Sequence, residues 1–170
     1  MRQKGQTLLE ILFAFGVSIM GMSATILSVT TALNNIQYAK NQSLANLSAQ
    51  EGMAVIRQIR DSNWNYFSTR LTDFSSGLKY CIDENLVLKG PISSAGYCFG
   101  DNAVGEKGNF SREVEFEHSS DACATNCPGA GCVKGSKVTV TVSWSDNKCS
   151  VGAPRCHKVE LITCFSNTSV

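Results

Sequence analysis

Charged residues are missing from a long stretch near the start of this 170-residue chain. No Asp, Glu, Lys, Arg or His occurs from Ile11 to Ala39, and no proline occurs before Pro91. Because a helix rises about 1.5 Å per residue, roughly 20 apolar residues cross the ~30 Å hydrocarbon core of a bilayer. The stretch is therefore long enough to cross a membrane as a helix, and no proline breaks that helix.

An excess of either charge is also missing. The chain has 15 Lys and Arg residues against 14 Asp and Glu residues, which gives a net charge of +1. Proteins that coat nucleic acid carry a strong positive excess, because they neutralise phosphates. The balance therefore argues against that class, and no nucleic-acid partner is predicted.

The residues and motifs of enzyme active sites are scarce as well. The chain has two histidines, His118 and His157, and it lacks the G-x-S-x-G, HExxH and P-loop motifs. The remaining aspartates, such as Asp73, Asp101 and Asp121, lie in expected loops, where this residue more often caps a turn than binds calcium. We therefore predict no catalytic activity, no metal site and no cofactor.

Cysteine is absent from the first 80 residues and frequent afterwards. The eight cysteines are Cys81, Cys98, Cys123, Cys127, Cys132, Cys149, Cys156 and Cys164. An even number confined to one region is typical of a disulfide framework in an oxidising compartment. Arg2 and Lys4 precede the apolar stretch, and positively charged flanks tend to stay in the cytoplasm. Both features place the cysteine-rich region outside the cell membrane.

Sequence spacing favours two disulfide pairs among the many that eight cysteines allow. Cys149 and Cys156 flank the short loop SVGAPR, and Cys81 and Cys98 flank an expected hairpin. The other four cysteines would then pair among themselves. The alternative is a zinc site built from a histidine and the three closely spaced cysteines that begin at Cys123. Structural zinc sites usually combine two cysteine pairs, and a second pair is missing, so disulfides are favoured.

The apolar pattern continues at helical spacing beyond the uncharged stretch. Its members are Leu33, Ile36, Leu44, Leu47, Met53, Val55, Ile56 and Ile59. This spacing places them on one helical face, with Asn, Gln, Ser and Lys on the other. Gly52 weakens the segment by about 1 kcal/mol relative to alanine. Because Asp61, Ser62 and Asn63 favour a helix end, we predict one helix over about 6–62, with a membrane half and a water half.

Beyond about residue 68 the apolar residues alternate with polar ones. The alternating segments are centred on Tyr80, Val87, Phe116, Val140 and Leu161. Each predicts a half-buried antiparallel strand, and glycine-rich connections separate them. Glu113, Glu115 and Glu117 are predicted on the solvent face of their strand. Trp64 and Trp144 are predicted to be core or helix-packing residues.

Two ordinary explanations of the amino terminus leave one residue unexplained. A secretory signal peptide has an apolar core of about 7–15 residues followed by a cleavage site, and this apolar stretch is longer. A single-pass membrane anchor fits the length and the basic flank. Neither explains why a carboxylate, that of Glu10, stands where the apolar helix begins.

The stretch KGQTLLE, from Lys4 to Glu10, resembles the processing site of type IV prepilins. The resemblance combines a basic leader, a glycine, a glutamate at a set distance and an unbroken apolar helix. It implies that a prepilin peptidase cleaves between Gly5 and Gln6 and methylates the new amino terminus. Glu10 then becomes the fifth residue of the mature chain, where this family carries its glutamate. The chain differs from many pilins in having Gln6 first and no proline in the apolar helix.

The resemblance also implies a partner for Glu10. A lone carboxylate in a membrane helix is unfavourable by several kcal/mol. In pilin-like assemblies the amino terminus of one subunit lies near the glutamate of its neighbour, and the charge pair neutralises the buried acid. The same pair fixes the axial register between subunits. Glu10 is thus predicted to be an assembly contact, and the alternative is an acid at the membrane edge.

Together these features predict an α+β, pilin-like fold, in which a long amino-terminal helix packs on an antiparallel, disulfide-rich β head. The expected divisions are a leader over 1–5, a transmembrane assembly half over 6–33, an amphipathic half over 34–67 and a head over 68–170. We predict a structural subunit, major or minor, of a type IV pilus used for adhesion, motility or DNA uptake. The alternatives are a pseudopilin of a type II secretion or competence machine and a membrane-anchored extracellular binding module.

The predicted partners follow from the same resemblance. They are further copies of the chain or other pilins in a helical filament, the prepilin peptidase and an inner-membrane assembly platform. The precursor would lie in the cytoplasmic membrane with its amino terminus inside and its head outside. The mature chain would lie in a pilus on the cell surface.

Overall fold

The computed structural model of the chain describes residues 4–65, 67, 79–92, 98, 103–104, 109–117, 135–146, 149–150 and 155–166. The first element is the helix α1 (Lys4–Ser62), and its last residue is the one predicted. Six strands follow: β1 (Lys79–Ile82), β2 (Leu88–Ile92), β3 (Ala103–Val104), β4 (Phe110–Glu117), β5 (Gly135–Trp144) and β6 (His157–Ser166). The chain forms two compact units, Met1–Asn41 and Gln42–Val170, and α1 contributes to both. We call the second of these the head unit.

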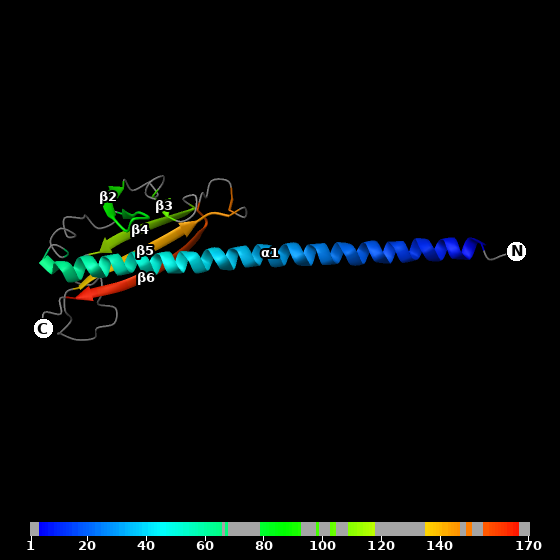
Figure 1. The fold of residues 1–170 in the computed structure, drawn as a ribbon, viewed down its shortest axis with the longest axis horizontal. Coiled ribbons are helices and arrows are strands. Elements are labelled where there is room, and N and C mark those ends of the chain that lie inside the picture. The colour runs from blue at the N-terminus through cyan, green and yellow to red at the C-terminus, as the bar shows by residue number, and fades with distance from the viewer. Residues whose placement is uncertain are drawn as a thin grey trace. The chain divides into compact units, whose positions relative to one another are not determined.

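The strands of the head unit form one antiparallel sheet in the order β2-β1-β4-β5-β6 (Figure 1), and β3 also pairs with β4. The predicted α+β class is therefore confirmed. The strands expected around residues 80, 116, 140 and 161 are present. Of the segment expected around residue 87, only Leu88 belongs to a strand, because β2 begins there, after Leu86 and Val87. The two-residue strand β3 was not predicted, because two residues are too few to show an alternating pattern.

The longest pairings of the sheet are those of β5, which lies between β4 and β6. Its register with β4 runs from Phe110↔Trp144 to Glu117↔Lys137, and it pairs with β6 from Gly135↔Ser166 to Trp144↔His157. Val138, Val140 and Val142 are fully buried on the face that packs against the helix. The alternation of valine with threonine or serine thus becomes one dry face and one wetter face, as a half-buried strand requires.

The helix buries only part of the apolar face that the sequence pattern predicted. Met53 and Ile56 of that face are buried, whereas Leu44 and Leu47 are 42% and 54% exposed. The buried residues are Ala45, Ala49, Met53 and Ile56, with Ser48 beside them. Two of these are alanines, whose short side chains allow a helix to lie close to an opposing surface. A pattern that weighs residues by hydrophobicity selects the larger leucines and overlooks the alanines.

At Gly52 the helix lies close to the sheet. A Cβ atom at this position would lie 3.0 Å from Arg112 Cδ and 3.1 Å from Val140 Cγ1, which is closer than carbon atoms normally pack. The residue that weakens the helix in isolation therefore allows it to dock.

Aromatic rings close the end of the core near the carboxyl end of α1. The Phe67 ring meets the rings of Phe116 and Phe165 edge to face, with centroids 6.4 and 5.7 Å apart. The guanidinium of Arg60 lies 4.9 Å above the Phe165 ring. Trp144 is 2% exposed, and Trp64 packs against the core, so the predicted packing roles of both tryptophans are confirmed.

The outer face of β4 is less exposed than the sequence indicated. Glu113 is only 4% exposed, so its predicted place on a solvent face was wrong. Its carboxylate accepts hydrogen bonds from Lys79 Nζ at 3.0 Å and from Ser111 Oγ at 3.2 Å. Cys98 lies close to the same strand, with its backbone N–H donating to Ser111 Oγ. Glu115 and Glu117 are half-buried.

Candidate functional site

The predicted processing site lies in the first turns of α1. Gly5 and Gln6 are part of the helix backbone, and the side chains of residues 4–7 lie outside the described residues. Glu10 is exposed. Within the described residues its carboxylate makes no ion pair or hydrogen bond. The residue predicted to need a partner from another molecule therefore has none in this part of its own chain.

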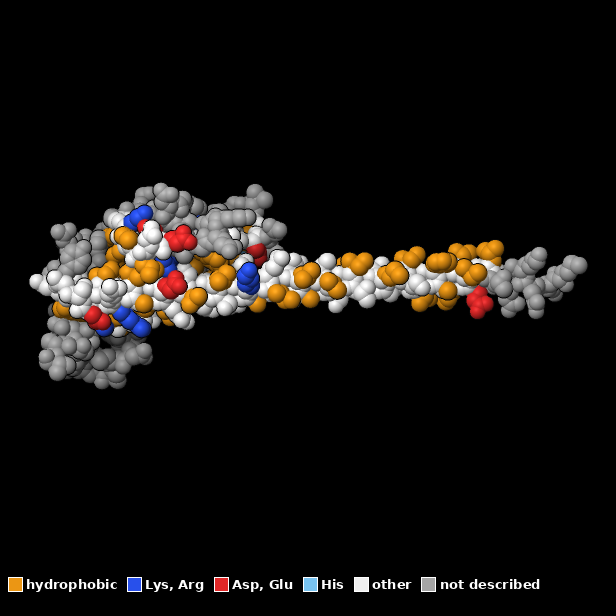
Figure 2. Space-filling view, viewed as in Figure 1, with side chains coloured by type: hydrophobic (Ala, Val, Ile, Leu, Met, Phe, Trp, Pro, Cys, Tyr) orange, Lys and Arg blue, Asp and Glu red, His pale blue; other side chains and the backbone are white. Residues whose placement is uncertain are grey.

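Exposed apolar side chains follow Glu10 along the helix (Figure 2). We call residues 8–33 the assembly segment. Its large apolar side chains are Leu8, Leu9, Ile11, Leu12, Phe13, Phe15, Val17, Ile19, Met20, Met22, Ile26, Leu27, Val29 and Leu33, each at least 54% exposed. By length and composition α1 can cross a membrane. Such a surface is typical of a helix covered by lipid or by other helices.

Hydroxyl groups in the assembly segment bond back to the helix itself. Ser18 Oγ donates to the Ala14 carbonyl at 2.8 Å, and Ser23 Oγ donates to the Ile19 carbonyl at 2.9 Å. The hydroxyls of Thr25, Thr30 and Thr31 make bonds of the same kind. These bonds satisfy donors that would otherwise be unpaired in a bilayer. The segment thus suits an apolar medium despite its serines and threonines.

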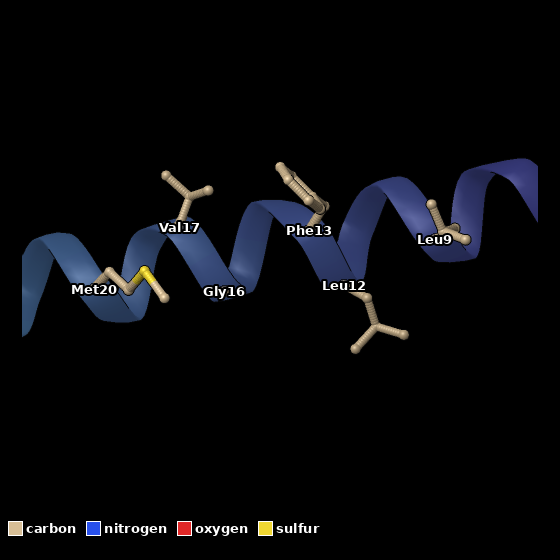
Figure 3. Close-up of a pocket in the computed structure, with 6 residues that line it drawn as sticks. All are labelled: Leu9, Leu12, Phe13, Gly16, Val17 and Met20. Carbon is tan, nitrogen blue, oxygen red and sulfur yellow. The ribbon is translucent and has the colours of Figure 1, made fainter.

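One face of the assembly segment is hollowed at Gly16 (Figure 3). The hollow is a shallow groove of about 380 Å³, lined by Leu9, Leu12, Phe13, Gly16, Val17 and Met20. Nothing lies within 4 Å of the position that a Cβ atom would take at Gly16. The groove begins one residue before Glu10, so an apolar hollow and the unpaired carboxylate stand at the same end of the helix.

In the head unit a buried guanidinium ties the helix to the sheet. The Arg112 side chain is fully buried. Its Nη1 donates to the Ser48 carbonyl at 3.0 Å and lies 3.3 Å from a Glu51 carboxylate oxygen. Its Nη2 donates to the Asp83 carbonyl at 2.6 Å, and its Nε donates to the Ile82 carbonyl at 3.3 Å. One side chain of β4 therefore holds α1 and the end of β1 together. We call this group the Arg112 clamp.

Charge balance explains why the clamp is tolerated in the core. Burial lowers the pKa of Arg112, and the nearby carboxylates of Glu51 and Asp83 oppose that effect. Glu51 is half exposed, so its charge remains hydrated while it compensates the guanidinium. Loss of either the buried cation or its acceptors strongly destabilises a protein that contains such a group. The clamp was not predicted, although period two places Arg112 on the apolar face between Phe110 and Val114.

The turn between β1 and β2 is fixed by Asp83. Its carboxylate accepts the Val87 N–H at 2.9 Å and pairs with Lys89 Nζ at 3.2 Å. The hydrogen bond and the ammonium group lower the pKa of Asp83, despite its burial. Leu86 has a φ of 61°, which a bulky side chain seldom adopts, and its N–H donates to the Asp83 carbonyl. Asp83 thus links the turn to the Arg112 clamp.

The two disulfide pairs favoured by sequence spacing are both present. They are Cys81–Cys98 and Cys149–Cys156. Cys164 is also disulfide-bonded. Cys123, Cys127 and Cys132 lie outside the described residues, as do His118, Asp73, Asp101 and Asp121. The prediction that these three cysteines form disulfides rather than a zinc site therefore stays a prediction.

The Cys149–Cys156 disulfide lies beside His157. Asp146, His157 and the two sulfurs of Cys149 and Cys156 lie within 4.8 Å of one another, a distance that suits a metal ion. Both sulfurs are in the disulfide bond, however, so neither is a thiolate ligand. His157 Nε2 lies 3.0 Å from an Asp146 oxygen, and its ring stacks on Trp144. These contacts fix the end of the β5–β6 hairpin.

The chain therefore combines an apolar helix that carries one unpaired acid with a head unit held by disulfides and a buried arginine. The first feature suits association with lipid or with other helices, and the second suits a rigid domain. No protein-family model, curated protein or solved structure matches the chain.

Proposed function

We propose that this chain is a pilin-like structural subunit, made as a membrane precursor and cut between Gly5 and Gln6. The observation that carries the proposal is the order of features from Lys4 onward. The prepilin-like stretch KGQTLLE leads directly into an unbroken, exposed apolar helix, and Glu10 is the only charged residue from Leu8 to Ala39. A plain membrane anchor requires no acid at that place.

The assembly step follows from the electrostatics of Glu10. Cleavage before Gln6 creates an α-ammonium group at the start of the helix, and methylation keeps its positive charge. In an apolar bundle this group on one copy compensates the carboxylate of Glu10 on another. The precursor remains in the membrane until an inner-membrane assembly platform brings copies together. The filament then forms through the helices and displays the head units on the cell surface.

The head unit supports this proposal through its mechanical design. A filament subunit has to pass pulling forces from its helix to its exposed domain. The Arg112 clamp bonds the helix to two strands at the Ser48 and Asp83 carbonyls, and disulfides close two loops of the sheet. Separating the helix from the sheet would expose a buried charge and several carbonyl groups at once.

The proposal is tested by expressing the full chain in a bacterium with a prepilin peptidase and a pilus assembly platform. Filaments sheared from the cells would be analysed without reduction by intact mass and amino-terminal sequencing. We expect a chain that begins at Gln6. A chain that still begins at Met1 and is found only in the membrane fraction would overturn the proposal and favour an anchored binding module. Processed chains in short rods that never reach the surface would favour a pseudopilin.

A pair of matched variants tests the role of Glu10. Glu10→Gln should be cleaved before Gln6 but should not be recovered in filaments, because the neutral amide has no charge to offer the neighbouring ammonium. Glu84→Gln removes an exposed acid from the head unit and should assemble normally. Equal filament yields from the two variants would show that Glu10 is not part of the assembly contact.

A further inference from the structure

The groove around Gly16 has apolar walls and no occupant within the described part of the chain. Its residues recur at helical spacing, so that they form one face of the assembly segment (Figure 3). A gap of this kind leaves the wall atoms without close contacts on one side. Lipid acyl chains or the side chains of another helix would fill it.

Glu10 distinguishes between these two occupants. It directly follows Leu9, which forms one end of the groove. An acyl chain supplies no positive charge, whereas a second copy cut before Gln6 supplies an α-ammonium group. A carboxylate in apolar surroundings requires such a partner. Charge complementarity therefore favours a second copy, and this step rests on the proposed function.

The charge pair also sets the level at which the second copy lies. Copies inserted in one membrane have the same orientation, so their helices run parallel. If residue 6 of the second copy lies level with Glu10 of the first, the copies are offset by four residues, or about 6 Å along the axis. The residue of the second copy level with Gly16 is then Leu12, between Ile11 and Phe13.

We propose that the groove at Gly16 receives the turn 11–13 of a second copy, with Leu12 as the inserted side chain. The absence of a side chain at residue 16 lets the two helices approach closely, as small residues do between membrane helices. Large apolar side chains on one copy thus fill a gap on the next. Leu12 lies at the edge of the same helix face in its own copy, so the contact joins the apolar faces of two parallel helices.

Four variants of the full chain test this contact in cells that assemble the parent chain. Gly16→Leu fills the groove, and Gly21→Leu is its matched control, because Gly21 also has nothing within 4 Å but does not line the groove. Overpacking should lower the filament yield of Gly16→Leu about tenfold, with little effect for Gly21→Leu. Leu12→Gly should also lower the yield. The exchange variant, Leu12→Gly with Gly16→Leu, restores the summed volume at the contact and should recover filaments.

Cross-linking tests the register directly and does not depend on filling the groove. Two chains would be co-expressed, one with Leu12→Cys and the other with Gly16→Cys, and oxidised within intact filaments. We expect a covalent heterodimer whose linked peptides contain residues 12 and 16. The control pairs Leu12→Cys with Gly21→Cys, which lies five residues further along the helix and should link much less.

The outcomes separate this contact from the proposed function. Normal filaments from Gly16→Leu, or equal linkage of residue 12 to residues 16 and 21, would overturn the groove contact and leave lipid as its occupant. The pilin-like function would survive that result. A parent chain that is never cut before Gln6 would overturn both. Loss of filaments from Gly16→Leu while its amino terminus is still cut normally would show that membrane insertion is intact and would support the contact.

Discussion

Replacing Arg112 with methionine should destabilise the head unit strongly. Methionine keeps much of the apolar stem but removes every donor of the clamp. The carbonyls of Ser48, Ile82 and Asp83 then lose a charged donor inside the core. Hydrogen bonds to charged groups contribute about 1.5–3 kcal/mol each, although relief of the guanidinium's burial offsets part of that loss. The Asp83 carbonyl also keeps the Leu86 N–H as a second donor.

We therefore expect the free energy of unfolding to fall by about 3 kcal/mol in Arg112→Met. The assay is urea unfolding of the full chain in detergent micelles, followed by tryptophan fluorescence, because Trp144 is buried in the core. Arg155→Met is the matched control, since Arg155 also donates to a sheet carbonyl, that of Ser143 at 3.0 Å, but is only half-buried. Equal losses of stability in the two variants would refute the reasoning, because the clamp would then contribute no more than a surface arginine.

Three further changes test other parts of the head unit by the same unfolding assay. Gly52→Ala should destabilise the head unit by about 1 kcal/mol, because the new methyl group meets the sheet, although alanine favours helices. Gly90→Ala serves as the control, since a Cβ atom at Gly90 has no neighbour within 4 Å. A Gly52→Ala variant that is more stable than the parent chain would contradict the close approach. The folded-state pKa of Asp83 is lowered from 3.8, so its stabilising effect is present above pH 3.8 and is lost as the pH falls through the folded pKa. The parent chain should therefore have a higher free energy of unfolding than Asp83→Asn near neutral pH, and this difference should disappear in strong acid. A difference that persists in strong acid would refute the stabilising role of the Asp83 carboxylate. Replacing Cys149 and Cys156 together with serine should lower the free energy of unfolding by about 2–3 kcal/mol, as expected for a short closed loop, and no change would show that the bond is dispensable.

Elements with a strong local signal were predictable from the sequence. The helix ends at Ser62, where short polar residues compete for its backbone groups, and the long strands β4, β5 and β6 follow alternating apolar residues. The disulfides that close local loops were also predictable, because cysteines close in sequence can meet without any knowledge of the remaining fold. Local pattern sufficed in each of these cases.

Features that depend on the distance between elements were not predictable. Leu44 and Leu47 were predicted on the apolar face of the helix but are exposed, and Ala45 and Ala49 are buried in the core instead. Glu113 looked exposed because its partner Lys79 is 34 residues away in sequence. A sequence pattern records which residues are apolar, whereas it does not record how much space the opposing element leaves.

Arg112 was missed for a related reason. A charged residue on the inward side of a strand reads as a break in the alternating pattern, and nothing near it in sequence reveals its acceptors. These acceptors are carbonyl groups on α1 and at the end of β1, brought together only by the fold. The useful signal is the exception itself, since a cation among Phe110, Val114 and Phe116 has to be paired to be buried.

Glycine has the same physical effect at two places in α1, and the comparison supports the assembly contact. At Gly52 the missing side chain is matched by an opposing surface, because Arg112 and Val140 approach to about the distance of a clash with any Cβ atom. At Gly16 the missing side chain leaves a groove that nothing within the described chain approaches. Glycine weakens a helix by about 1 kcal/mol relative to alanine unless close packing compensates. For Gly52 the compensation comes from the sheet. Gly16 differs from Gly21, which also has no neighbour within 4 Å, because Gly16 lines a groove, and the carboxylate of Glu10 next to that groove makes another copy the more favourable source of packing.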